Sequence, residues 1–146
     1  MYFVIVTIIF NLLCIWFMPK KLSWKEIYIT WGIFAAITIN TDIIVGEIID
    51  LYDFTAPGLQ FEDVFIDALL PPSFAIIFLN FMPEDNNTFI KYLVFWTAFS
   101  VSYEWAAVHY GFIILKGWSL WYSFLVYFLV FLLLRWHLKF IRKIYI

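Results

Sequence analysis

The sequence is poor in charge, glycine and cysteine. Only 14% of its 146 residues are charged, against about a quarter in an ordinary soluble domain. Its single cysteine, Cys14, excludes an internal disulfide. The five glycines include no Gly-x-x-x-Gly pair that would favour helix dimerisation in a membrane. Cys/His metal-ligand spacing, a nucleophile elbow and a phosphate-binding glycine loop are also missing from the sequence, so it offers no support for those chemistries.

Apolar and aromatic residues fill the space that charge leaves. Hydrophobic residues make up 65% of the chain and aromatic residues 24%. This length accommodates about five membrane spans of roughly 20 residues with short connections, and leaves no room for a separate soluble domain. We therefore predict an all-α, multi-pass membrane protein in which residues 1–146 form one transmembrane helical bundle in the cell membrane.

Apolar runs and helix boundary signals predict five transmembrane helices. Ser23 and Glu26 match the Ser-x-x-Glu capping box, which predicts a helix start near Trp24. Pro57-Gly58 is a strong turn signal between the second and third apolar runs. The predicted spans are residues 2–18, 24–45, 62–82, 89–110 and 120–134.

Three of these spans have features of their own. Asn11 lies in the middle of the first span, where we expect it to form a hydrogen bond to another helix. Pro71 and Pro72 lie inside the third span, which we expect to be kinked or broken there, because proline cannot continue the backbone hydrogen bonding of a helix. The fifth span is almost wholly Phe, Leu, Val, Tyr and Trp, and we expect it to face lipid.

Basic residues are concentrated on one side of the predicted bundle. Eight of the nine Lys and Arg residues fall on that side and only Lys116 falls opposite. The positive-inside rule then predicts an amino terminus outside and a carboxyl terminus inside. The basic residues near the carboxyl terminus are typical of topology determinants and lipid headgroup contacts, so no nucleic-acid partner is expected.

Most acidic residues fall on the predicted outer side. At about 1.5 Å of rise per residue, Asp42, Asp67 and Glu104 lie at similar depth on three helices. An ionisable group inside a membrane span is costly and commonly functional. We therefore predict an outward-facing acidic pocket. Its candidate residues are Glu104, Asp42, Asp67, His109, Tyr103 and Thr41.

The sequence leaves the function of this pocket open between three classes. Clustered carboxyl groups could carry a proton, a cation or a small polar ligand, as in a binding or transport component. The alternative is an accessory or scaffold protein of a membrane complex, and a weaker one is a lipid-modifying enzyme that uses the acids as acid and base. Catalytic residues, a metal site and a cofactor are not assigned. A transporter of five spans encloses little more than one pocket, so homo-oligomers or a larger membrane complex are expected partners beside the lipid bilayer.

Several short motifs carry a family resemblance. They are Pro19-Lys20-Lys21, Glu26-Ile27-Tyr28, Asp50-Leu51-Tyr52, Pro57-Gly58, Asn80-Phe81-Met82-Pro83, Tyr103-Glu104-Trp105, Gly117-Trp118-Ser119-Leu120-Trp121-Tyr122-Ser123 and Leu138-Lys139-Phe140. With these motifs the chain resembles a family of uncharacterised small integral membrane proteins of spore-forming bacilli and clostridia. The resemblance covers most of the chain and implies about five spans in a bacterial cytoplasmic or spore membrane. It implies no activity.

Overall fold

Five helices follow the apolar runs of the chain in a computed structural model that describes residues 1–145. In chain order the elements are α1 (Tyr2–Phe17), α2 (Trp24–Asp42), the π-helix η1 (Ile43–Ile48), β1 (Tyr52–Phe54), α3 (Phe61–Phe81), α4 (Asn86–His109), β2 (Ile113–Leu115) and α5 (Leu120–Tyr145). The predicted all-α class is confirmed. The sequence did not predict the two short strands, which pair in an antiparallel manner.

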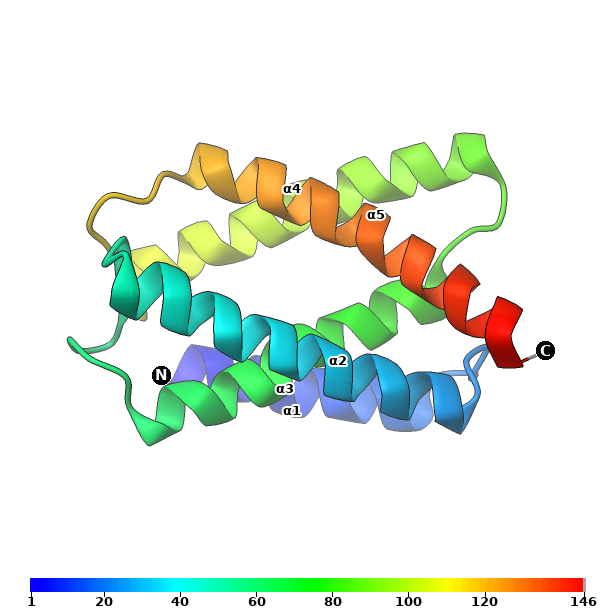
Figure 1. The fold of residues 1–146 in the computed structure, drawn as a ribbon, viewed down its shortest axis with the longest axis horizontal. Coiled ribbons are helices and arrows are strands. Elements are labelled where there is room, and N and C mark those ends of the chain that lie inside the picture. Colours follow the sequence, from blue (N-terminus) through cyan, green and yellow to red (C-terminus); the bar gives the residue numbers. More distant parts are fainter. Residues whose placement is uncertain (146) are drawn as a thin grey trace.

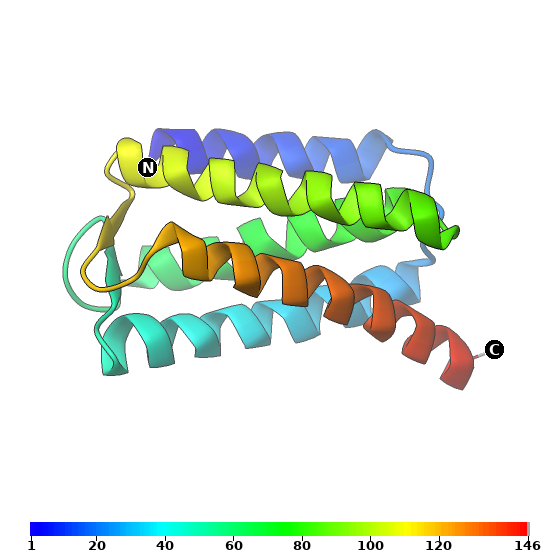
Figure 2. The same ribbon diagram turned by 90° about the horizontal axis from the view of Figure 1, so that it is seen from above.

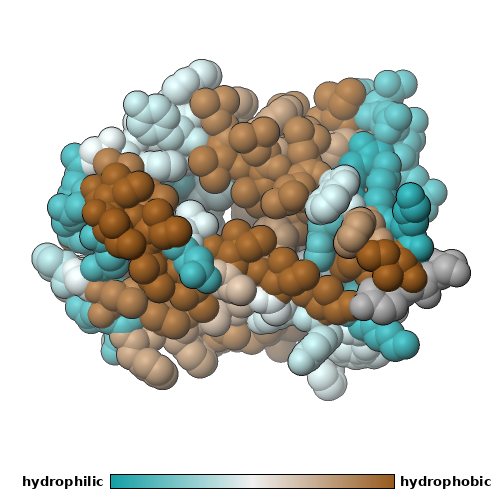
Figure 3. Space-filling model, in the orientation of Figure 1, coloured by the Kyte–Doolittle hydropathy of each residue, from teal (hydrophilic) through white to brown (hydrophobic). Residues whose placement is uncertain are grey.

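Three helical segments of the described chain are long and apolar enough to cross a membrane. They are Trp24–Ile48, Phe61–Phe81 and Leu120–Ile144. α1 is apolar but shorter, with 16 residues, and α4, with 24 residues, is not among the three. Brown, hydrophobic side chains cover much of the face seen in Figure 3. These features support association with a membrane.

The helices pack as two layers along a common long axis (Figures 1 and 2). α3 packs against both α1 and α2, whereas α4 packs against α5. One large core cluster includes Phe78, Phe89 and Leu134, and a smaller cluster includes Ile66 and Phe112. We call the end that carries β1 and β2 the strand end. We call the opposite end, where α1 connects to α2 and α3 to α4, the basic end, because eight of the nine Lys and Arg residues lie toward it.

The largest difference from the predicted spans is at the end of the chain. α5 continues past residue 134 to Tyr145, because apolar residues at helical spacing go on packing inward. Leu134, Leu138 and Ile141 are 1%, 2% and 6% exposed. The basic tail is therefore part of a helix, and its positive groups hold defined positions around that helix.

Two local predictions are confirmed. The Ser23 hydroxyl accepts a hydrogen bond from the Glu26 amide at 3.2 Å, and the Glu26 carboxylate accepts one from the Ser23 amide at 2.7 Å. These two bonds form the predicted capping box. Asn11 Nδ2 donates to Ser73 Oγ at 3.0 Å, which joins α1 to α3 as expected for a polar residue between membrane helices.

Pro71 and Pro72 lie inside α3 without breaking it. The helix runs from Phe61 to Phe81 with both prolines in its interior, so the predicted break is wrong, while the kink stays a prediction. Pro72 leaves the Ala68 carbonyl, four residues earlier, without its usual partner. Trp31 Nε1 of α2 donates to this carbonyl at 3.0 Å. A neighbouring helix thus satisfies the free carbonyl, which is the condition for tolerating proline in a membrane helix.

Replacing Trp31 with Phe tests this role. Phe keeps an aromatic side chain, although a smaller one, but lacks the indole N–H, so the Ala68 carbonyl loses its partner. We expect the free energy of unfolding to fall by about 1–2 kcal/mol. Denaturation of the purified protein with sodium dodecyl sulfate measures it. Trp24→Phe is the matched control, since Trp24 is 65% exposed, and its effect should stay within about 0.5 kcal/mol. Equal effects in both variants would contradict the role assigned to Trp31.

Candidate functional site

A cavity of about 420 Å³ lies between α2, α3, α4 and α5 and reaches the strand end, where residues of β1 and β2 contribute to its wall. Most of its lining side chains are apolar or aromatic. Its polar lining includes three carboxyl groups, and no Lys, Arg or His of residues 1–145 lines it. The ionisable side chains that line this largely apolar cavity are therefore all acidic.

The cavity brings together three carboxyl groups that the sequence placed at similar depth. Asp42 comes from α2, Asp67 from α3 and Glu104 from α4. Asp67 and Glu104 are 5% and 8% exposed, and Asp42 is half-buried. Tyr103 and Thr41 also line the cavity. Within residues 1–145, no group of three or more Asp, Glu, His or Cys side chains is placed to hold a metal ion.

The structure does not bring the fourth ionisable candidate, His109, into this cavity. Its side chain is exposed and does not line the cavity, and its ring stacks on Trp105 at 5.4 Å between ring centres. Five residues separate it from Glu104, which rotates it by about 140° around α4. A residue at that angle points away from a cavity that Glu104 faces. Similar depth along the helix was therefore not sufficient to place it.

Glu104 accepts a hydrogen bond on each carboxylate oxygen. Ser123 Oγ donates to Oε1 at 2.6 Å and Tyr127 Oη donates to Oε2 at 2.6 Å. Trp118 Nε1 donates to Ser123 Oγ at 2.7 Å. Because an indole N–H can only donate, it directs the Ser123 proton toward Glu104. Both oxygens of Glu104 therefore act as acceptors in this network.

Ser123 and Tyr127 were missed by the sequence reasoning, which expected the fifth span to face lipid. Much of α5 does expose apolar side chains, but Ser123 is only 2% exposed and both residues line the cavity. Their spacing of four residues places them on one face of the helix. Two hydroxyl groups at this spacing in an otherwise apolar helix were the signal that could have identified an inward-facing stripe.

Asp42 and Asp67 form a second polar group in the same cavity. Both carboxyl groups line the cavity, and Tyr52 Oη donates a hydrogen bond to Asp42 Oδ1. Burial raises the pKa of Tyr52, and the charge of Asp42 raises it further. The Tyr52 hydroxyl therefore remains a donor.

A clamp between two distant loops positions the aromatic residues at the strand end. Tyr52 pairs with Leu115 in the antiparallel register of β1 and β2. The Leu51 carbonyl accepts backbone hydrogen bonds from residues 116, 117 and 118 at 3.0–3.2 Å. Lys116 Nζ forms ion pairs with Asp53, at 2.8 Å, and with Asp50. These contacts hold Tyr52 and Trp118 edge to face with ring centres 6.1 Å apart, where both line the cavity.

The stability that this clamp contributes should depend on pH. The hydrogen bonds from Lys116 to Asp50 and Asp53 raise the pKa of Lys116. A cation whose pKa is raised on folding contributes its full stability below the unfolded pKa, about 10.4, and loses it as pH rises through the folded value. The difference in unfolding midpoint between wild type and Lys116→Gln should stay constant up to about pH 9 and shrink above about pH 10.5. Thermal unfolding at each pH measures it. Lys91→Gln is the control. If its difference from wild type changed with pH in the same way as that of Lys116→Gln, the result would contradict the role of the clamp.

The resemblance to small membrane proteins of spore-forming bacteria stays a prediction. No protein-family model, curated protein or solved structure matches this chain.

Proposed function

We propose that this protein is a binding or transport component of a membrane, whose cavity takes up an organic cation with an ammonium group on an apolar body. One observation carries the proposal: carboxyl groups line the cavity, and no cationic side chain of residues 1–145 lines it. A buried charge without a partner is costly. A cation from outside the chain would supply the missing partner.

The rest of the cavity favours an organic cation over a metal ion. About 420 Å³ lies within the usual range of small-molecule pockets, about 300–1,000 Å³. Rings of Phe34, Phe74 and Phe131 also line the cavity, and they suit an apolar body. Near the acids the rings of Tyr52 and Trp118 suit an ammonium group, because aromatic faces attract cations.

We propose a five-span arrangement with the amino terminus outside and the carboxyl terminus inside. Three helices are long and apolar enough to span, and α1 and α4 complete the count. α4 supports this by exposing Ile90, Val94 and Phe95 by 57%, 55% and 62%, as expected for a helix in contact with lipid. The concentration of Lys and Arg at the basic end supports placing that end inside. The strand end and the acidic part of the cavity then lie toward the outside.

The cavity has an opening between α2 and α5. Ile37 and Thr41 of α2 and Val126 of α5 line the cavity and are also exposed at the surface. Figure 3 shows this face hollowed near its centre. The hydrogen bonds between α2 and α5, Thr30 to His137 and Arg142 to Glu26, lie nearer the basic end. A ligand that partitions into the bilayer could therefore reach the acids from the side.

Equilibrium dialysis of the full chain in lipid nanodiscs tests the proposal. The probe is radiolabelled 2-phenylethylamine at neutral pH, and the control is 2-phenylethanol, which has the same apolar body without the charge. We expect saturable binding of one amine per chain, with the alcohol at least about tenfold weaker. Equal binding of both would show that the charge is not recognised. No saturable amine binding would favour the scaffold function. Uptake into proteoliposomes then separates transport from binding.

A further inference from the structure

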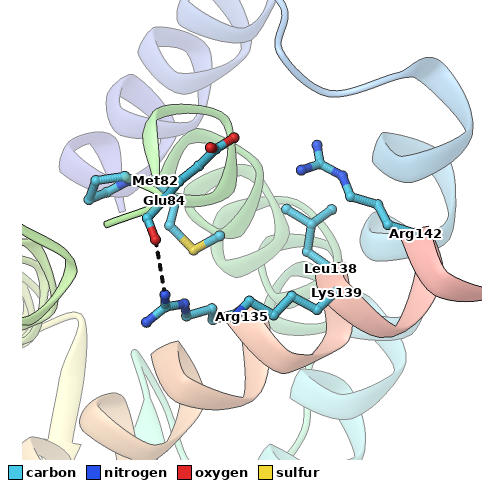
Figure 4. Close-up of a pocket in the computed structure, with 7 residues that line it drawn as sticks. Met82, Glu84, Arg135, Leu138, Lys139 and Arg142 are labelled. Carbon is cyan, nitrogen blue, oxygen red and sulfur yellow. Dashed lines mark hydrogen bonds between the residues drawn. The ribbon is translucent and has the colours of Figure 1, made fainter. Parts of the chain in front are cut away.

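A second pocket, of about 270 Å³, lies at the basic end and takes no part in the amine site. It is formed by the connection between α3 and α4 on one side and by the last turns of α5 on the other (Figure 4). Its lining residues are Met82, Pro83, Glu84, Arg135, Leu138, Lys139 and Arg142. Unlike the larger cavity, this pocket has more basic than acidic groups.

The three basic residues lie on one face of α5. Arg135, Lys139 and Arg142 follow one another at spacings of four and three residues, which keeps their side chains on the same side of a helix. Figure 4 shows the two guanidinium groups on either side of Leu138, with Met82 and Glu84 facing them across the pocket. The helical tail of α5 thus presents three cations to one small space.

Arg135 is held in place with donors to spare. Its Nη2 donates to Asn86 Oδ1 at 2.7 Å and to the Glu84 carbonyl at 3.4 Å. Its guanidinium lies 3.9 Å above the ring centre of Phe89. Its Nε is buried and has no hydrogen-bond partner within the described residues. A guanidinium carries five N–H donors, so Arg135 is fixed in position while only one of its nitrogens is used.

The pocket keeps an excess of positive charge. Arg142 is paired with Glu26 at 2.6 Å, and Glu84 supplies one further carboxylate at the pocket. Lys139 is exposed and forms no ion pair within residues 1–145. Three cations therefore face two acids, and of these three only Arg142 forms an ion pair within residues 1–145.

We propose that this pocket binds a phosphate group, carried by the headgroup of an anionic lipid or free in solution. Arginine forks match phosphate oxygens, and such charge-assisted hydrogen bonds are among the strong ones. Basic pockets between membrane helices at the inner side suit anionic headgroups. Leu138 and Met82 offer an apolar wall to the glycerol part of a lipid. The proposal uses only the basic end, so it stands or falls independently of the amine site.

Native mass spectrometry of the full chain tests it, in detergent with equal amounts of phosphatidylglycerol and phosphatidylcholine. Both lipids contain a phosphodiester, but only phosphatidylglycerol has net negative charge. We expect wild type to retain phosphatidylglycerol over phosphatidylcholine. Lys139→Gln should lower that retention by about fivefold to tenfold. Lys143→Gln makes the same charge change on the next exposed turn, outside the pocket, and should lower it by less than about twofold.

The outcomes separate a site from general attraction and identify the source of the phosphate. Equal losses in Lys139→Gln and Lys143→Gln, or no preference for phosphatidylglycerol in wild type, would overturn the proposal. Displacement of the lipid by inorganic phosphate supports a site that recognises the phosphate alone. Retention of the lipid despite inorganic phosphate supports the lipid headgroup as the source. Glu84→Gln changes the charge in the opposite direction and should strengthen retention, because it removes the acid at the pocket.

Discussion

Replacing Glu104 with Gln should weaken the binding of 2-phenylethylamine by about tenfold or more, while the protein still folds. Gln has nearly the same shape as Glu, so the cavity keeps its walls, but the charge that faces the ammonium group is lost. Hydrogen bonds to charged groups contribute about 1.5–3 kcal/mol, which corresponds to roughly tenfold to a hundredfold in affinity. Equilibrium dialysis in nanodiscs measures the change.

Glu62→Gln is the matched control for this variant. Glu62 is an exposed acid in the first turn of α3 and does not line the cavity, so the same chemical change there should alter affinity by less than about twofold. Similar losses in both variants would mean that general attraction of the strand end for cations explains binding. Unchanged affinity in Glu104→Gln would remove Glu104 from the site.

The affinity and stability of Glu104→Gln together distinguish a binding role from a scaffold role. Removing a buried charge can leave stability unchanged or raise it, although the amide nitrogen of Gln cannot accept the proton of Ser123 or Tyr127 as a carboxylate oxygen does. We therefore expect affinity to fall without a matching loss of stability. If neither wild type nor Glu104→Gln binds the amine, and Glu104→Gln is the more stable of the two, the result would support the scaffold role.

Depth along a helix could be predicted from the sequence, and this is why the acids were found. The rise per residue of a helix is constant, so the span boundaries place Asp42, Asp67 and Glu104 at similar heights. The direction in which a side chain points depends in addition on the rotation of about 100° per residue around the helix axis. This rotation turns His109 away from the side of α4 that carries Glu104, and it places Ser123 and Tyr127 on the inward side of α5.

Contacts between distant loops could not be predicted in this way. The pairing of Tyr52 with Leu115 joins segments that have no common local signal, because an antiparallel register is set by the residues of both strands together. Tyr52, which donates to Asp42, lies in one of these paired strands. Likewise, the sequence shows that Pro72 frees a carbonyl, but the packing of α2 on α3 decides that Trp31 satisfies it.

Asn80 should be among the residues on which stability depends most. Its side chain is fully buried, near the end of α3. Its Oδ1 accepts hydrogen bonds from the amides of Lys21, at 2.8 Å, and Leu22, at 3.3 Å. Its Nδ2 donates to the Pro19 carbonyl at 3.1 Å. The single amide side chain of Asn80 thus forms hydrogen bonds to three backbone groups of the connection between α1 and α2.

Asn80→Ala should lower the free energy of unfolding by about 3 kcal/mol or more, because it leaves three backbone groups without their partners and each such loss costs about 1–3 kcal/mol when water cannot replace it. Denaturation with sodium dodecyl sulfate measures the loss. Asn87→Ala is the control at an exposed residue and should change stability by less than about 0.5 kcal/mol. A loss in Asn80→Ala no larger than in the control would show that water satisfies the connection. The basic end would then not depend on α3 to fix the start of α2.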